Sequence, residues 1–350
     1  MVESGLSGMA QTVLGPVAPG VLGLTSSHEH LLLDFTLAFK TPPQAGERHR
    51  AFQPVTMDNL GWVRYDPFKN RPDLLTLDED VAISEALLFK RAGGGTVIDT
   101  TSVGIRRDPL ALARVSRATG LNVVMGSGYY VAATHPEDMD GKSEDEIARE
   151  IVEDITTGAG ATGVRAGIIG ELGCSWPLTA NERKGLRAGA RAQQETGASI
   201  TVHPGRDEAA PFDVLDVLEE AGADPGRVII DHLDRTIFKV DTLLRLAERG
   251  CYLEYDFFGW EVSQFSLSER DMPNDAQRIG FIKRLVDEGF SRRVVIGQDM
   301  FGHHRLTKYG GHGFAHILQN VAPMMREVGL SEDQVDDILV KNPAAILTFV

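Results

Sequence analysis

The alternation of short β-branched runs with segments of helical periodicity constrains this fold most. Eight runs rich in Val, Ile and Thr recur along the chain, and predicted helices at 78–92, 143–155, 179–196, 212–221, 240–249 and 275–288 lie between them. Strands that alternate with helices form parallel sheets, and eight strands favour closure into a (β/α)8 TIM barrel. The predicted strands are 20–27, 95–102, 121–128, 164–172, 198–203, 227–232, 250–256 and 293–299.

Helix start signals support these strand and helix boundaries, and the turn after the first predicted strand argues against an open sheet. A doubly wound sheet would place a glycine-rich phosphate turn after its first strand. The segment 25–35, TSSHEHLLLDF, contains no glycine, so the barrel is the better prediction. Capping boxes, in which a Ser or Thr is followed three residues later by Glu or Gln, mark helix starts at Ser143, Thr179 and Ser331.

Length and composition predict one globular domain over residues 1–350. The segment 40–77 contains five prolines and no clear periodicity, and its aromatic residues favour an ordered lid loop after the first strand. The formal net charge of −15 makes nucleic acid and anionic membranes poor candidate partners. Two cysteines, no export signal and no apolar run of membrane length predict a cytoplasmic protein.

Possible metal ligands stand where five of the apolar runs end. In a TIM barrel the catalytic groups come from this end of the strands. Successive side chains on a strand face opposite sides, so His28 and His30 can aim at one point while Glu29 points away. Imidazoles and carboxylates together suit a divalent metal such as zinc, manganese, iron or nickel. The five strand ends carry His28 with His30, Glu171, His203, His232 and Asp299.

Each of these residues also has an ordinary structural role when it is taken alone. His203 and His232 could be core or rim histidines, and Asp299 could cap the segment that follows it. Glu171 could be a buried ion-pair partner. These roles would require five independent coincidences at five strand ends, so a metal site is the better interpretation.

Longer stretches of the chain resemble a known family. The segments AGIIGELG, TVHPGR and IIDHLDRT, with the His-x-His pair and the last Asp, are similar to the phosphotriesterase-like branch of the amidohydrolase superfamily. More narrowly, GIIGELGCSWPLTANERK, CYLEYDFFG, KYGGHGF and NLGW resemble the phosphotriesterase-related group. The resemblance covers nearly the whole chain.

The resemblance implies a binuclear metal centre with a bridging group on the fourth strand. His28, His30 and Asp299 would hold the more buried metal, and His203 and His232 the exposed one. Many relatives bridge the metals with a carbamylated lysine, but this chain has no lysine between 142 and 184. Glu171 lies one position beyond the usual lysine site, so it can bridge only if the strand bulges or ends there. Two divalent ions are expected, zinc first, with manganese, iron, cobalt or nickel as alternatives.

The resemblance further implies a hydrolase that uses a metal-bound hydroxide, with Asp299 taking the proton of the water. The expected substrate is a small anionic N-acyl compound of the N-acyl amino acid or N-acetyltaurine type. A lactonase or phosphotriesterase is the alternative, and a non-catalytic binding protein is the remote one. A homodimer is also implied.

Candidate substrate-binding residues follow the strand ends: Arg206, Arg235, Tyr130, Lys308 and His312, the last two in the loop after the eighth strand. Three of them have an equally compatible structural role. His312 could serve the loop structure, Arg235 could pair with Asp231 or Asp234, and Tyr130 could pack against other aromatic rings.

Overall fold

An eight-stranded parallel sheet, nearly closed into a barrel, forms the centre of the molecule in this computed structural model. The structure describes residues 6–262, 264–269 and 271–350. The sheet order is β12-β11-β10-β9-β8-β7-β6-β3, which is the sequence order of the predicted strands. The barrel prediction is therefore confirmed. Its strands are β3 Leu24–Glu29, β6 Gly94–Asp99, β7 Asn122–Ser127, β8 Ile168–Gly173, β9 Ile200–His203, β10 Val228–Ile230, β11 Tyr252–Tyr255 and β12 Val294–Ile296.

The first and last barrel strands meet at their carboxyl ends. The Ser27 hydroxyl donates to the Ile296 carbonyl oxygen at 2.7 Å. The backbone N–H groups of Gln298 and Asp299 both donate to the His28 carbonyl oxygen, at 3.2 and 3.1 Å. This seam places the first predicted ligand and the last one, Asp299, next to each other.

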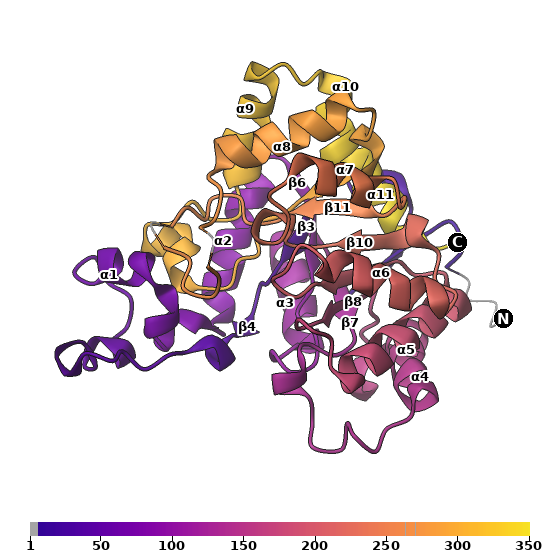
Figure 1. Cartoon of the computed structure of the whole chain (residues 1–350), viewed down its shortest axis with the longest axis horizontal. Coiled ribbons are helices and arrows are strands. Elements are labelled where there is room, and N and C mark those ends of the chain that lie inside the picture. The colour runs from indigo at the N-terminus through magenta and orange to yellow at the C-terminus, as the bar shows by residue number, and fades with distance from the viewer. Residues whose placement is uncertain (1–5, 263, 270) are drawn as a thin grey trace.

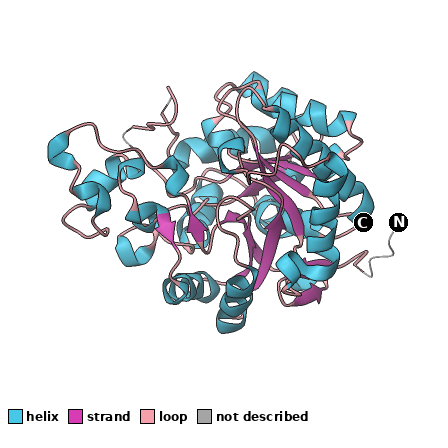
Figure 2. Cartoon of the chain, turned by 90° about the horizontal axis from the view of Figure 1, so that it is seen from below, coloured by secondary structure: helices cyan, strands magenta, loops and turns pink. Residues whose placement is uncertain are grey.

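Helices surround the barrel, as Figures 1 and 2 show. The three predicted capping boxes at Ser143, Thr179 and Ser331 are all present. The helices are α1 Leu60–Tyr65, α2 Glu79–Arg91, α3 Pro109–Thr119, α4 Glu144–Glu153, α5 Ala180–Thr196, α6 Ala210–Glu220, α7 Val240–Ala247, α8 Asp275–Asp287, α9 Ala322–Glu327, α10 Glu332–Asp336 and α11 Asn342–Leu347.

The amino end of the barrel is closed by elements that the sequence pattern did not reveal. A short hairpin of β1 (Ala10–Thr12) and β2 (Gly15–Val17) lies there, and Ala10 bridges to Thr348 just after α11. Ala10, Leu22 and Ile346 join the inward side chains of the strands in one apolar cluster. The barrel interior is therefore packed at this end, and polar chemistry is left to the other end.

The segment 40–77 folds as short helices outside the barrel. Its base is held by a two-stranded sheet in which β4 (Leu33–Asp34) pairs with β5 (Leu75–Thr76). Figure 1 shows α1 projecting from the barrel, while Phe68, from the same segment, is buried against Phe301 after β12. In the described part of the chain no helix has both the length and the apolar character needed to cross a membrane.

Candidate metal centre

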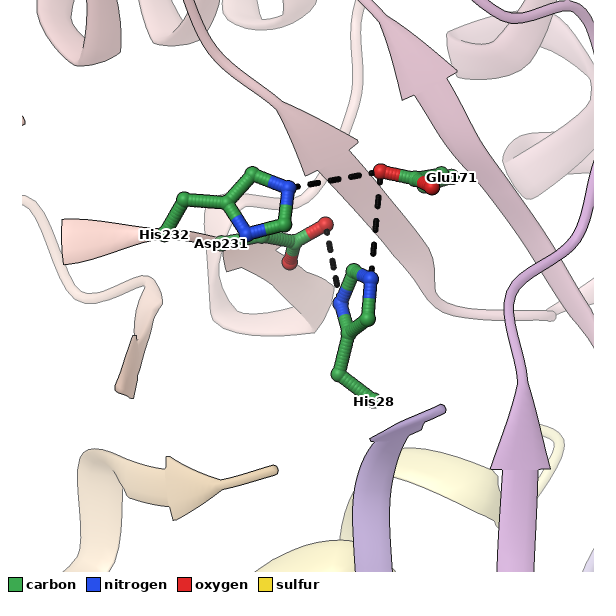
Figure 3. A group of neighbouring side chains, drawn as sticks. All are labelled: His28, Glu171, Asp231 and His232. Carbon is green, nitrogen blue, oxygen red and sulfur yellow. Dashed lines mark ion pairs between the residues drawn. The ribbon is translucent and has the colours of Figure 1, made fainter. Parts of the chain in front are cut away.

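The predicted ligands from five strand ends converge at the carboxyl end of the barrel. His28 and His30 come from the end of β3, Glu171 from β8, and His203 from the end of β9. Their side chains are all buried, as are those of His232 and Asp299, which follow β10 and β12. Figure 3 shows the Glu171 carboxylate facing the rings of both His28 and His232. The structure thus brings all six predicted metal ligands together.

His28 and His30 share one face, as their spacing predicts. The Nε2 atom of His30 lies 3.4 Å from Oε1 of Glu171 and 3.2 Å from Oδ1 of Asp299. The Nε2 atom of His28 lies 3.9 Å from Oε2 of Glu171. Glu29 points elsewhere, since its carboxyl accepts a hydrogen bond from Ser26 at 2.6 Å.

Glu171 reaches the site because β8 is irregular at that point. The register of β8 against β9 shifts between Ile169 and Leu172, and the intervening Gly170 has a φ of 109°. That φ lies in the region that favours glycine. The peptide between Gly170 and Glu171 is cis. The shifted register turns the Glu171 side chain inward from a position one residue beyond the usual lysine site.

His203 and His232 form the second half of the cluster. The Nδ1 atom of His203 lies 3.1 Å from Oε2 of Glu171, and Nε2 of His232 lies 3.5 Å from the same oxygen. Burial, followed by the charge of the nearby Arg235, holds the pKa of both imidazoles well below the usual value. Both rings are therefore neutral near pH 7, which is the form that binds a metal.

The donor set fits divalent cations. Both ring nitrogens of His28 are fully buried and have no hydrogen-bond partner in the described chain. Burial, together with the neighbouring Asp299 charge, raises the pKa of Glu171 to about 8. A divalent cation would meet both needs, because it accepts the imidazole lone pair and stabilises the ionised carboxylate. Among the described residues three overlapping groups have ligand atoms within 4.8 Å of one another: His28 with His30 and Asp299, His28 with Glu171, Asp231 and His232, and His28 with Asp231, Glu254 and Asp256.

Three further carboxylates lie behind His28, and the sequence analysis did not assign them. The Nδ1 atom of His28 is 3.6 Å from Oδ2 of Asp231, 3.8 Å from Oε2 of Glu254 and 3.4 Å from Oδ2 of Asp256. Asp256 also accepts hydrogen bonds from His232, at 2.9 Å from its backbone N–H and 2.8 Å from Nδ1. A signal was present, because Glu254 and Asp256 are two residues apart, like the two histidines of the first strand.

A buried arginine supports this carboxylate layer. Arg278 of α8 is fully buried, and its Nε donates to Oδ2 of Asp234 at 3.0 Å while its Nη1 donates to Oδ1 of Asp275 at 2.8 Å. Asp234 in turn accepts from the backbone N–H groups of Phe257 at 3.1 Å and Asp256 at 3.4 Å. The ion pair therefore fixes the loop that carries Asp256.

Replacing Arg278 with Met should lower the free energy of unfolding by about 3–5 kcal/mol, because it leaves the buried Asp234 without its cation and Asp275 with His316 alone. Urea titration followed by circular dichroism measures this loss. Arg284→Met on the same helix is the control, since its pair with Glu288 is half exposed and should contribute no more than about 0.5 kcal/mol. Equal losses in the two variants would contradict the supporting role of Arg278.

A pocket opens onto the metal-ligand cluster. It encloses about 400 Å³ of empty space, including the part that opens to solvent. Aromatic rings form most of its wall, and two arginines form another part. The lining residues are His30, Leu33, Phe35, Phe68, Ile105, Tyr130, His203, Arg206, Arg235, Phe257, Trp260, Phe265, Leu267, Asp299 and Phe301.

The two arginines lie in this pocket without a paired acid among the described residues. Arg235 is buried, and its Nε has no hydrogen-bond partner in that part of the chain. Burial, and then the like charge of Arg206, lower its pKa to about 9. The structural pairing of Arg235 with Asp231 or Asp234 is not observed, because Asp231 accepts from Thr201 and Asp234 pairs with Arg278.

Of the other three candidate substrate-binding residues, one lies in the pocket and two lie outside it. The hydroxyl of Tyr130 lies 3.2 Å from Nδ1 of His203, inside the pocket. Lys308 and His312 are exposed and do not line it. The ring of His312 stacks on that of His316, with 4.2 Å between the centroids. The geometry therefore favours a substrate role for Tyr130 and not for the two loop residues.

Comparison with known proteins gives a consistent assignment. The sequence model of the Phosphotriesterase family matches residues 8–347. The chain is 45% identical to the N-acetyltaurine hydrolase of Tetraodon nigroviridis over 348 residues, which is 99% of each chain. It is 43% identical to the phosphotriesterase-related protein of Nematostella vectensis over 347 residues, 98% of this chain and 99% of that one. The crystal structure of a Resiniferatoxin-binding protein from Rhodobacter sphaeroides superposes with a TM-score of 0.95 at 36% identity, covering 98% and 97% of the two chains.

Proposed function

Because the chain belongs to the phosphotriesterase family of metal-dependent hydrolases, we propose that it cleaves the amide bond of a small anionic N-acyl compound. The N-acyl amino acid and N-acetyltaurine types are the best candidates, and the relatives named N-acetyltaurine hydrolase support this class. One observation carries the proposal. The buried Arg235 and the exposed Arg206, neither paired with an acid among the described residues, line a pocket that also contains the metal ligands His30, His203 and Asp299.

Six residues would hold two divalent ions, for which we propose zinc. His28, His30 and Asp299 would bind one ion, His203 and His232 the other, and Glu171 would bind both. When bound, such ions lower the pKa of water and polarise the oxygen of the scissile bond. The chain's own residues must then orient the substrate and move the protons.

Asp299 is the residue placed to move a proton. Burial alone would raise the pKa of Asp299, but its hydrogen bond with His30 and the charges of His30, His28 and Arg305 together hold the pKa below the usual value. Its carboxylate is therefore ionised near neutral pH and can accept a proton from the attacking water. The same carboxyl can pass this proton to the leaving amine, which must be protonated to depart.

The arginine pair would bind the acid group of the substrate. A guanidinium presents two parallel N–H donors that match the oxygens of a carboxylate or sulfonate. Bound there, the anion would also relieve the repulsion between Arg206 and Arg235. The Tyr130 hydroxyl, beside His203, lies where it can donate to the oxygen of the scissile carbonyl.

The aromatic wall favours a second candidate, a lactonase or phosphotriesterase. Phe35, Phe68, Phe257, Phe265 and Phe301 all line the pocket, and such a surface suits a neutral, apolar ester. A neutral ester would leave the charges of the two arginines without a counter-ion, which disfavours its binding. We therefore rank it second.

A paired-substrate assay tests the proposal. Metal-loaded protein should hydrolyse N-acetyltaurine and N-acetylglycine with a kcat/KM at least about tenfold above that for N-ethylacetamide, which lacks the acid group. Arg206→Gln should remove most of this preference, whereas Arg165→Gln, an exposed arginine outside the pocket, should keep it. Arg206 is the better choice because Arg235 lies 3.0 Å from Nε2 of His203. Faster turnover of a γ-lactone or an aryl phosphotriester would favour the second candidate instead.

Two further properties belong to the proposal. Cys174 and Cys251 are both free and buried, which suits a reducing compartment, and we place the protein in the cytoplasm. A homodimer remains a prediction.

A further inference from the structure

Arg206 lines two cavities. One is the catalytic pocket, and the second encloses about 1,140 Å³ of empty space, including the part that opens to solvent. Among the described residues, Arg235 and Leu267 are the only others that line both. The Arg206 side chain is exposed and makes no hydrogen bond or ion pair with the described part of the chain. Arginine has many rotamers, so another contact must decide which cavity this guanidinium enters.

The second cavity would attract the guanidinium of Arg206. Asp207 and Glu269 line it, and both side chains are exposed. The acid that lines the catalytic pocket is Asp299, whose charge the proposed metal ions would share. Charge alone therefore favours the second cavity, where Arg206 would not meet a substrate bound at the metals.

Phe265 opposes this attraction. The Cζ atom of Arg206 lies over the Phe265 ring, 6.0 Å from its centroid. At that distance a guanidinium is attracted to the face of an aromatic ring. Phe265 is buried, and it lines the catalytic pocket but not the second cavity. Its ring therefore draws Arg206 toward the catalytic pocket.

The Phe265 ring is held in place by other aromatic rings. It packs edge-on against Trp260, with 5.5 Å between the centroids and an angle of 90° between the planes. Trp260 packs in turn against Phe301 after β12, at 4.7 Å. The ring is therefore a fixed surface on which the exposed arginine can lie.

The neighbouring residue ties the same loop to the segment 40–77. The Ser266 hydroxyl donates to Oδ1 of Asp66 at 2.9 Å, and the Ser266 carbonyl oxygen accepts from Nζ of Lys40 at 3.2 Å. These two bonds hold the loop after β11 against the projecting segment. They give that segment a part in fixing the ring of Phe265.

We propose that Phe265 is a positioning residue, which keeps Arg206 turned toward the catalytic pocket and so sets the preference for a substrate with an acid group. The inference rests on the proposed function, in which Arg206 binds that acid group. It adds the residue that selects the position of Arg206 from which this binding is possible.

Steady-state kinetics of the metal-loaded enzyme with N-acetyltaurine and N-ethylacetamide test the proposal. Phe265→Leu should raise the KM for N-acetyltaurine about two- to fivefold relative to the KM for N-ethylacetamide, the factor that corresponds to a cation–π contact of about 0.5–1 kcal/mol. Phe265→Met, a second side chain without a ring, should have the same effect. Phe265→Tyr keeps the ring and should keep the ratio of the two KM values.

Two further measurements separate positioning from a general disturbance. Phe212→Leu removes the ring that lies 5.4 Å from Cζ of Arg245, outside both cavities, and should leave the ratio unchanged. Arg206→Gln should cost less in the Phe265→Leu background than in the wild type, because the guanidinium has already left the pocket. A distorted pocket would instead change both KM values together and leave the two substitutions additive.

The inference and the proposed function fail in different ways. A wild type that shows no preference for N-acetyltaurine over N-ethylacetamide would refute the proposed function. A wild-type preference that Phe265→Leu and Phe265→Met leave unchanged, or that Phe265→Tyr abolishes equally, would overturn the role of Phe265 alone. Additive effects of Phe265→Leu and Arg206→Gln would overturn it as well.

Discussion

Replacing Asp299 with Asn should lower kcat by about 10²–10⁴-fold while the fold remains intact, because the amide cannot accept the proton of the attacking water. The amide keeps an oxygen that can still face His30, so the cluster geometry should persist. Steady-state kinetics on the purified variant measures the loss, and metal analysis of the same sample shows whether both ions are retained. A kcat within threefold of the wild type would contradict the assigned proton transfer.

Glu29→Gln is the matched control for this experiment. Glu29 lies between His28 and His30 in the sequence and is fully buried, but its side chain contacts Ser26. Burial raises the pKa of Glu29 to about 8, so its carboxyl is mainly protonated near pH 7 and glutamine is a close substitute. This variant should keep kcat within a few-fold of the wild type. The contrast separates a carboxylate that faces the site from one that merely adjoins it in sequence.

The positions of the histidines were predictable because they depend on periodicity alone. A period of two places His28 and His30 on one face, and a barrel places every strand end at the same rim. No property of the neighbouring residues is needed to obtain that result. The same rule applied to β11 would have found Glu254 and Asp256, which were not assigned from the sequence.

The direction of Glu171 could not be derived in the same way. It depends on a register shift between β8 and β9 and on the positive φ of Gly170, which are properties of strand pairing. The sequence showed only that glycines would permit such a bulge. Lys308 and His312 do not line the catalytic pocket, and the sequence could not show this because a loop's place in the chain does not fix which side of the rim it covers.

Glu171→Gln should reduce the metal content from two ions per chain toward one, because a neutral amide is a much poorer bridging ligand than a carboxylate. Dialysis against a weak chelator followed by elemental analysis measures the stoichiometry. Glu85→Gln is the control, since Glu85 is equally buried but accepts hydrogen bonds from the backbone of Thr307 and Lys308 instead. That variant should retain both ions.

The same variant should also change how the metals contribute to stability. A ligand present at 100 times its Kd stabilises the native state by about 2.7 kcal/mol, so chelation should lower the Tm of the wild type. In Glu171→Gln, chelation should lower the Tm by less, because fewer ions are bound to remove. Unchanged stoichiometry together with an unchanged response to the chelator would contradict the bridging role and leave Glu171 as a buried partner of His203. The two measurements together therefore distinguish a lost ligand from a general loss of stability, since the latter would lower the Tm of the variant without altering its metal content.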